Sequence, residues 1–74
     1  MEEYRNLNGN SGVDAYEIGN SFIRVRFNSG YVYLYTIISA GADNIQNMIS
    51  LAEIGKGLNA YINKNVKFGY DKQG

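Results

Sequence analysis

Residues 22–36 have the sequence FIRVRFNSGYVYLYT, and this stretch decides the fold. Apolar and arginine residues alternate over its first six positions, which is the period of a β-strand with one buried face. Its last six positions are rich in tyrosine and β-branched residues, which also favour strand. Between the two parts, Asn28, Ser29 and Gly30 have the composition of a turn. The stretch therefore predicts a β-hairpin with strands over Phe22–Phe27 and Tyr31–Thr36.

The length of the turn decides which side of the sheet the tyrosines face. A three-residue loop, with Gly30 in the left-handed position of a bulge, places Val25 opposite Tyr33 and Ile23 opposite Tyr35 on the core side. A two-residue loop would shift the register by one residue and lay the tyrosines beside the arginines, as in a base-stacking platform. We favour the three-residue loop because Asn, Ser and Gly suit its three positions and because it gathers the apolar surface on one side.

A further strand is predicted before the hairpin, over Val13–Ile18. Either Tyr16 and Ile18 or Val13 and Ala15 can face inward. We favour the first pair because it buries more apolar area. Glu17 then lies on the arginine face, where it can neutralise an arginine.

Two helices are predicted after the hairpin, over Asp43–Ile54 and Gly57–Asn65, because apolar residues recur there at helical spacing. Asp43 is the favoured N-cap of the first helix and Ser39 the alternative. Gly55 has the position of a left-handed C-terminal cap. Strands followed by helices predict an α+β fold, a three-stranded antiparallel meander with both helices on one face.

The predicted organisation is a loose N-terminal arm over residues 1–12, one domain over residues 13–70 and a tail over residues 71–74. Phe68 and Tyr70, at the end of the domain, are expected to fold back onto its body. The predicted core consists of Ile23, Val25, Phe27, Tyr33, Tyr35, Ile45, Met48, Ile49, Leu58, Tyr61 and Ile62.

Composition narrows the function classes. The 74 residues carry seven basic and seven acidic side chains, so there is no overall positive charge to attract nucleic acid. Cysteine and histidine are absent, which excludes a disulfide, a thiolate or imidazole metal site and histidine-activated nucleophiles. The acids are scattered rather than paired at motif spacing. We therefore expect no enzyme and no cofactor, and a cytoplasmic protein without signal peptide or membrane span.

The order of residues from Val13 to Tyr70 resembles the KTSC domain, a small module found at the C-terminus of some lysyl-tRNA synthetases and as stand-alone proteins. The resemblance rests on Phe27-Asn28-Ser29-Gly30, Tyr33-x-Tyr35, Gly55-Lys56-Gly57-Leu58-Asn59 and Ile62. The chain lacks the family's usual Val-Pro step at the start of the first helix, and it has Glu53 or Ile54 where the family tends to place a serine. The resemblance implies an α+β fold and, through the synthetase, an RNA-associated role.

Three groups of residues are candidates for binding. Lys56, Lys64 and Lys67, with the backbone amides near Gly57, can form a basic edge for an anion or nucleic acid. Arg24 and Arg26 form a second such candidate on the sheet. Val32 and Leu34, between the arginines, are candidates for a protein interface at the open sheet face or its edge.

We expect a non-catalytic binding module with weak association with RNA or tRNA. The alternative is protein–protein association or homodimerisation, so the protein is expected to be a monomer or a homodimer. The alternative interpretation of the lysines involves no ligand: they complement a helix dipole and keep the surface solvated.

Overall fold

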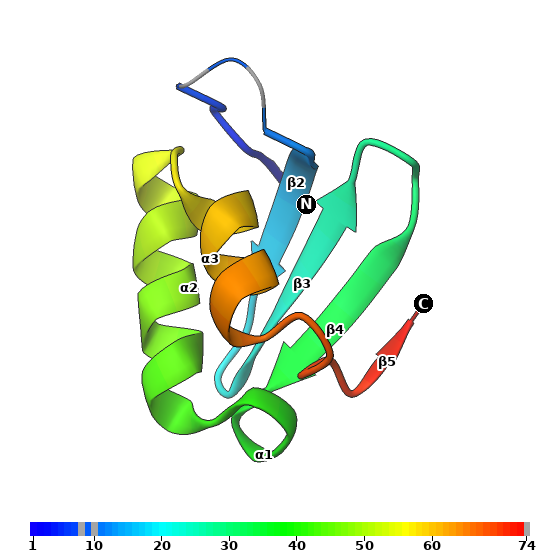
Figure 1. Cartoon of the computed structure of the whole chain (residues 1–74), viewed down its shortest axis with the longest axis vertical. Helices are drawn as coiled ribbons and strands as arrows, with labels where there is room; N and C mark the ends of the chain where they lie inside the picture. Colours follow the sequence, from blue (N-terminus) through cyan, green and yellow to red (C-terminus); the bar gives the residue numbers. More distant parts are fainter. Residues whose placement is uncertain (8, 10, 74) are drawn as a thin grey trace.

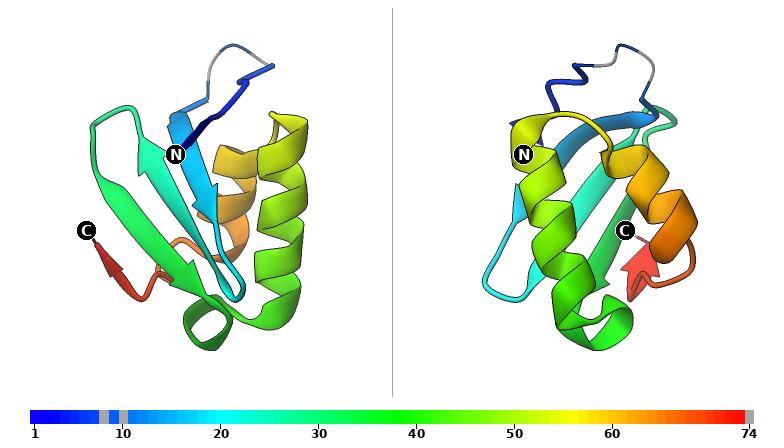
Figure 2. Two further views of the ribbon diagram at one scale, coloured as in Figure 1. Left: turned by 180° about the vertical axis from the view of Figure 1, so that it is seen from behind. Right: turned by 60° about the vertical axis from the view of Figure 1, so that its left-hand side comes forward.

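The computed structural model describes residues 1–7, 9 and 11–73 and confirms the α+β fold. An antiparallel sheet in the order β1-β2-β3-β4-β5 forms one layer, and helices α2 and α3 cover one of its faces (Figure 1). Figure 2 shows both helices on the same side of the sheet from two further directions. The elements are β1 (Glu2–Glu3), β2 (Val13–Ile18), β3 (Phe22–Phe27), β4 (Val32–Thr36), α1 (Ile37–Ala40), α2 (Ala42–Ile54), α3 (Leu58–Asn65) and β5 (Lys72–Gln73).

The hairpin has the predicted three-residue loop. Val25 pairs with Tyr33 and Ile23 with Tyr35, so the register is the one that turns the tyrosines toward the helices. Gly30 has φ 94°, and its N–H donates to the Phe27 carbonyl at 2.8 Å. That backbone conformation suits glycine because a Cβ would be strained there.

Strand β2 contains an irregularity that the alternating pattern does not predict. The register shifts between Val13 and Ala15, which leaves Asp14 as the extra residue of a bulge. Val13 and Tyr16 are therefore both buried on the core side, although they were expected to face opposite ways. Ile18 lies on the same side but is 37% exposed at the strand end, so the expectation that it is buried is wrong.

The helical half begins earlier than predicted. The Thr36 hydroxyl accepts the Ser39 N–H, and the Ser39 hydroxyl accepts the Thr36 N–H, a reciprocal cap that starts the one-turn helix α1. Helix α2 then follows Gly41, which has no capping side chain. The expectation that Asp43 or Ser39 caps α2 is therefore wrong. Gly55 ends α2 in the left-handed conformation, with φ 91°, as predicted.

The N-terminal segment packs onto the domain where a loose arm was expected. Strand β1 pairs with β2, and the adjoining Tyr4 is only 4% exposed. The Tyr4 hydroxyl accepts the Leu58 N–H at 3.2 Å, at the start of α3. Arg5 donates to the carbonyls of Glu53 and Ile54, at the end of α2. The segment therefore fastens the turn between the two helices.

The core lies between the sheet and the helices. Most of the predicted core residues are buried, whereas four of them, Phe27, Tyr33, Ile49 and Tyr61, are only partly buried against it. The buried apolar residues outside the predicted list are Tyr4, Val13, Ala15, Tyr16, Ala52 and Val66.

Candidate functional site: an aromatic pocket beside helix α3

A pocket of about 500 Å³ opens between the β3–β4 hairpin, helix α3 and the segment that follows it. This volume is in the range of small-molecule sites, roughly 300–1,000 Å³. Its rings come from both halves of the fold, because the chain after α3 turns back toward β4. The aromatic lining residues are Phe27, Tyr33, Tyr35, Phe68 and Tyr70.

The rings pack against one another with defined geometry. Tyr70 lies 4.8 Å from Tyr33 and 6.4 Å from Tyr35, between ring centroids. Tyr33 in turn meets Phe27 edge to face at 5.6 Å. Tyr70 thus folds back onto the body as predicted, whereas Phe68 is 80% exposed at the pocket rim and does not. The result is an aromatic lining of tilted and edge-to-face rings, against which a planar ligand can pack.

Polar groups line the side of the pocket that α3 forms. Asn59 and Asn63 are one helical turn apart, and neither side chain forms a hydrogen bond to another described residue. Lys67 also lines the pocket, with its Nζ 5.7 Å from the centre of the Phe68 ring. No acidic residue is among the described lining residues. The pocket therefore offers unpaired amides and one positive charge to a ligand.

The tyrosine at the back of the pocket is neutral at physiological pH. Tyr35 is 1% exposed, and burial, followed by the neighbouring Tyr33 and Tyr70, raises its pKa to about 12. A phenol that keeps its proton remains a hydrogen-bond donor and adds no negative charge. The pocket therefore repels neither an anion nor an aromatic ligand.

The predicted lysines separate into two places. Lys64 and Lys67 line a shared hollow of about 390 Å³ beside the pocket, on the last turn of α3 and just after it. Lys56 and Gly57 line another hollow, of about 260 Å³, which also contains Tyr4 and shares Asn59 and Asn63 with the aromatic pocket. Because Leu58 N–H already donates to Tyr4, one amide of the predicted anion corner is occupied.

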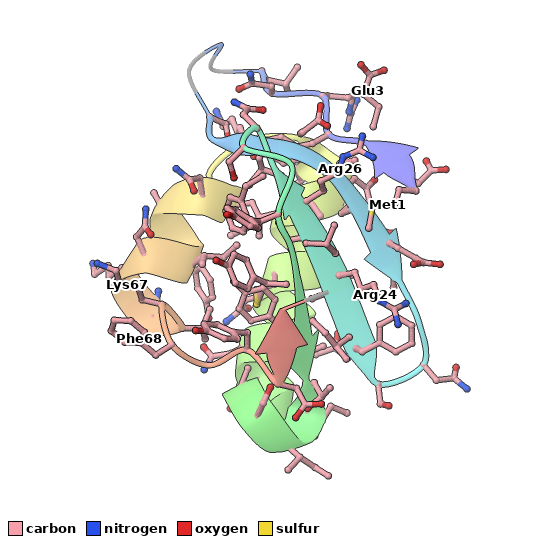
Figure 3. The ribbon with its side chains drawn as sticks, turned by 90° about the vertical axis from the view of Figure 1, so that its right-hand side faces the viewer. Met1, Glu3, Arg24, Arg26, Lys67 and Phe68 are labelled. Atoms are coloured by element: carbon pink, nitrogen blue, oxygen red, sulfur yellow. The ribbon has the colours of Figure 1, made fainter. Side chains whose placement is uncertain are left out.

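Both arginines of the sheet are paired. Arg24 Nη1 is 3.2 Å from Glu17 Oε1, and Arg26 Nη2 is 2.7 Å from Asp14 Oδ2. A pairing of Glu17 with one of the two arginines was predicted, and its partner is Arg24, whereas Arg26 pairs with Asp14 of the bulge. Figure 3 shows Arg24 and Arg26 on the side of the sheet opposite to Lys67 and Phe68. The two basic groups therefore do not form one surface, and the arginine face is compensated.

The predicted apolar interface is less exposed than expected. Val32 and Leu34 are both half-buried, and β5 pairs along the outer edge of their strand, which was predicted to be an open edge. The most exposed large apolar residue in the described part of the chain is instead Ile38, in α1, at 96%. Its neighbour Ile37 is 42% exposed.

Comparison with known proteins gave no match: no family model fits the sequence, and no curated protein or solved structure is similar enough to it to count as a relative. The resemblance to the KTSC domain stays a prediction. None of the described helices is long and apolar enough to cross a membrane. Among the described residues, no three acidic side chains gather into a group that could hold a metal ion.

Sequence reasoning identified Lys67 but missed the pocket around it. Tyr33 and Tyr35 were expected to be core residues, Asn59 was named only as part of the motif that resembles the KTSC domain, and Asn63 was not singled out. One signal was present: the apolar stripe of α3 at Leu58, Tyr61 and Ile62 places both asparagines together on an adjoining stripe.

Proposed function

We propose that the chain is a small non-catalytic module that binds a short stretch of single-stranded RNA in the aromatic pocket. The observation that carries the proposal is that one cavity is lined by closely packed tyrosine rings, by two amides that bond to no described residue and by Lys67, with no acidic side chain among the described lining residues. Single-stranded RNA is bound by stacking bases on aromatic side chains and by placing cations along the phosphates. The resemblance to a domain found in lysyl-tRNA synthetases supports the same partner.

Lys64 and Lys67 would contact the phosphates, because they line the hollow that adjoins the pocket. With two phosphate contacts, log K is expected to fall with log salt at a slope of about −1.4, which weakens binding roughly sevenfold between 50 and 200 mM salt. Binding of this kind is weak, in agreement with a chain of zero net charge.

The test is an NMR titration of the labelled protein with a single-stranded RNA hexamer of mixed sequence and with tRNA, each at the two salt concentrations. We expect the amide signals of Asn59, Asn63, Lys67 and Tyr70 to shift. Lys67→Gln should halve the salt slope, whereas Lys56→Gln should leave it unchanged, because Lys56 is not among the residues that line the aromatic pocket or the hollow of Lys64 and Lys67. Equal slopes for wild type and Lys67→Gln would contradict the assignment of the phosphate contacts.

Stacking is tested separately. Tyr70→Leu should weaken binding by at least about fivefold, since base stacking on one aromatic side chain contributes roughly 1–3 kcal/mol. The matched control is Tyr31→Leu, because Tyr31 is 58% exposed and lies outside the pocket. The proposal is wrong if neither RNA shifts any pocket signal at low salt, or if both tyrosine variants bind equally well.

Self-association is the alternative function, and one observation favours it. The adjacent Ile37 and Ile38 present apolar side chains to solvent on α1. A dimer mass in the absence of RNA-induced shifts would favour this alternative, and Ile38→Asp should then restore a monomer.

A further inference from the structure

The chain leaves helix α3 through a tight turn that carries a cation and an aromatic ring. The Gly69 N–H donates to the Val66 carbonyl at 2.8 Å, which closes a four-residue turn with Lys67 and Phe68 at its two central positions. The Lys67 Nζ lies over the Phe68 ring, 5.7 Å from its centre. Figure 3 shows both side chains at the surface of the molecule, just after α3. The turn therefore presents the charge and the ring together.

Both ends of this turn are held by the body of the protein. Val66 is 4% exposed and belongs to the core. The Ser39 hydroxyl donates to the Gly69 carbonyl at 2.8 Å, which joins the turn to α1. The 80% exposure of Phe68 is therefore set by a turn that is fixed on either side, and the ring can meet a ligand without a rearrangement of the fold.

The place of Phe68 matters more than its exposure, because single exposed apolar residues are ordinary on small proteins. Phe68 lines both the aromatic pocket and the adjoining hollow of Lys64 and Lys67. The other residues that these two cavities share are Asn63 and Lys67. The Phe68 ring therefore stands where the pocket passes into the hollow.

The other rings of the pocket have little free surface for a further base. The tyrosines meet one another tilted or edge to face, and Tyr35 is 1% exposed. Phe68 is the most exposed ring among the described lining residues, and it pairs with none of the other described rings. Every base has a π face, so a free ring of this kind can stack any base.

We propose that Phe68 stacks a second base of the bound RNA, so that the shortest strand that fills the site is a dinucleotide. The inference rests on the proposed function and names the length of its ligand. One base packs in the aromatic pocket, and the strand then passes Phe68 toward the hollow of Lys64 and Lys67. The phosphate that links the two nucleosides falls beside Lys67, because this residue lines both cavities and adjoins the Phe68 ring.

The experiment measures how much a second nucleotide adds to binding. NMR titration at the lower salt concentration compares adenosine monophosphate with the dinucleotide of two adenosines joined by one phosphate. Each ligand carries one phosphate group, so tighter binding of the dinucleotide reports the second nucleoside. The wild-type protein should bind the dinucleotide more tightly, and the dinucleotide should shift the amide signal of Phe68 as well as those of the pocket.

Phe68→Leu removes the ring and keeps an apolar side chain. The ratio of dinucleotide to mononucleotide affinity should be at least about fivefold lower in this variant than in wild type, the lower end of the effect of one stacked base. Phe68→Tyr keeps a ring and should restore the ratio. The matched control is Tyr31→Leu, which removes an exposed ring outside both cavities and should leave the ratio unchanged.

Urea unfolding separates the loss of a ligand contact from damage to the fold. Phe68→Leu should have the unfolding midpoint of wild type, because substitutions at exposed positions usually change stability little. A clear loss of stability in this variant would overturn the inference, because the ring would then serve the fold.

Failure of this inference is distinguishable from failure of the proposed function. Equal affinity ratios in wild type and Phe68→Leu overturn the second stacking position and leave binding at the pocket intact. A wild-type protein that binds the mononucleotide as tightly as the dinucleotide likewise overturns the inference. If neither these ligands nor the hexamer shifts any pocket signal, the RNA function falls and this inference falls with it.

Discussion

Tyr4→Phe removes one oxygen atom from the contact that joins the N-terminal segment to the helices. Tyr4 is 4% exposed, and its hydroxyl accepts the Leu58 N–H at 3.2 Å. That N–H belongs to the first turn of α3, where no partner exists within the helix. Phenylalanine fills the same space, so packing is retained and the hydrogen bond is the quantity tested.

The expected loss is about 1–2 kcal/mol, because a buried donor is left without a partner. With an m-value of about 1 kcal/mol per molar urea, as for small domains, the unfolding midpoint should fall by about 1–2 M. Thermal unfolding should show a Tm lower by roughly 4–8 °C for each kcal/mol. For a domain of 74 residues this is a large fraction of the total stability.

Circular dichroism during urea unfolding gives the midpoint, and amide hydrogen exchange of Leu58 gives the local effect. The matched control is Tyr31→Phe, since the Tyr31 side chain is 58% exposed and should change stability little. If Tyr4→Phe is as stable as the control and the Leu58 amide stays protected, then the segment does not hold α3 through this bond. The account of β1 and Tyr4 as part of the domain would then be refuted.

Two further predictions concern titration and backbone strain. The pKa of Tyr35 is raised to about 12 in the folded protein, so its contribution to stability is fully present below pH 10, its usual value, and is lost between pH 10 and 12. Urea unfolding of the wild-type protein should show a free energy of unfolding that falls by about 1.4 kcal/mol for each pH unit above 10. In Tyr35→Phe the free energy of unfolding should fall less over the same range. An equal fall in both proteins would contradict the assignment of this pH dependence to Tyr35. Gly55→Ala should lower the free energy of unfolding more than Gly30→Ala does. Both glycines have positive φ, but only at Gly55 would an added Cβ meet the Cβ of Arg5, at 2.7 Å. Equal losses of free energy in the two variants would contradict the packing of Arg5 against Gly55.

The hairpin was predictable because its determinants are local. The alternation at Phe22–Phe27 sets the two faces, and the three-residue loop ending at Gly30 sets the register. Helix α2 was predictable for a similar reason, since its apolar spacing and Gly55 both lie within one segment. Each of these signals can be evaluated without knowing what the segment packs against.

The remaining features depend on contacts between distant parts of the chain. The bulge at Asp14 lets Val13 and Tyr16 both reach the core. A strictly alternating strand would place these two residues on opposite faces, so the alternating pattern does not predict the bulge. Tyr4 stands in a polar segment, and its burial follows from the helix turn that it meets more than fifty residues later. The pocket is non-local in the same way, since Tyr70 reaches Tyr33 only after the chain has turned back past α3.

The location of the site follows from which polar groups the fold leaves unpaired. The arginines of the sheet are neutralised within the molecule, so a ligand anion would have to displace Glu17 and Asp14 to use them. On α3 the amides of Asn59 and Asn63 are committed to no described residue, and Lys67 has no acidic neighbour among the described pocket residues. Surface ion pairs contribute little to stability, whereas the amides of Asn59 and Asn63 lie beside the packed rings of the pocket. The binding proposed at the pocket would give these amides and Lys67 a partner that the described residues do not supply.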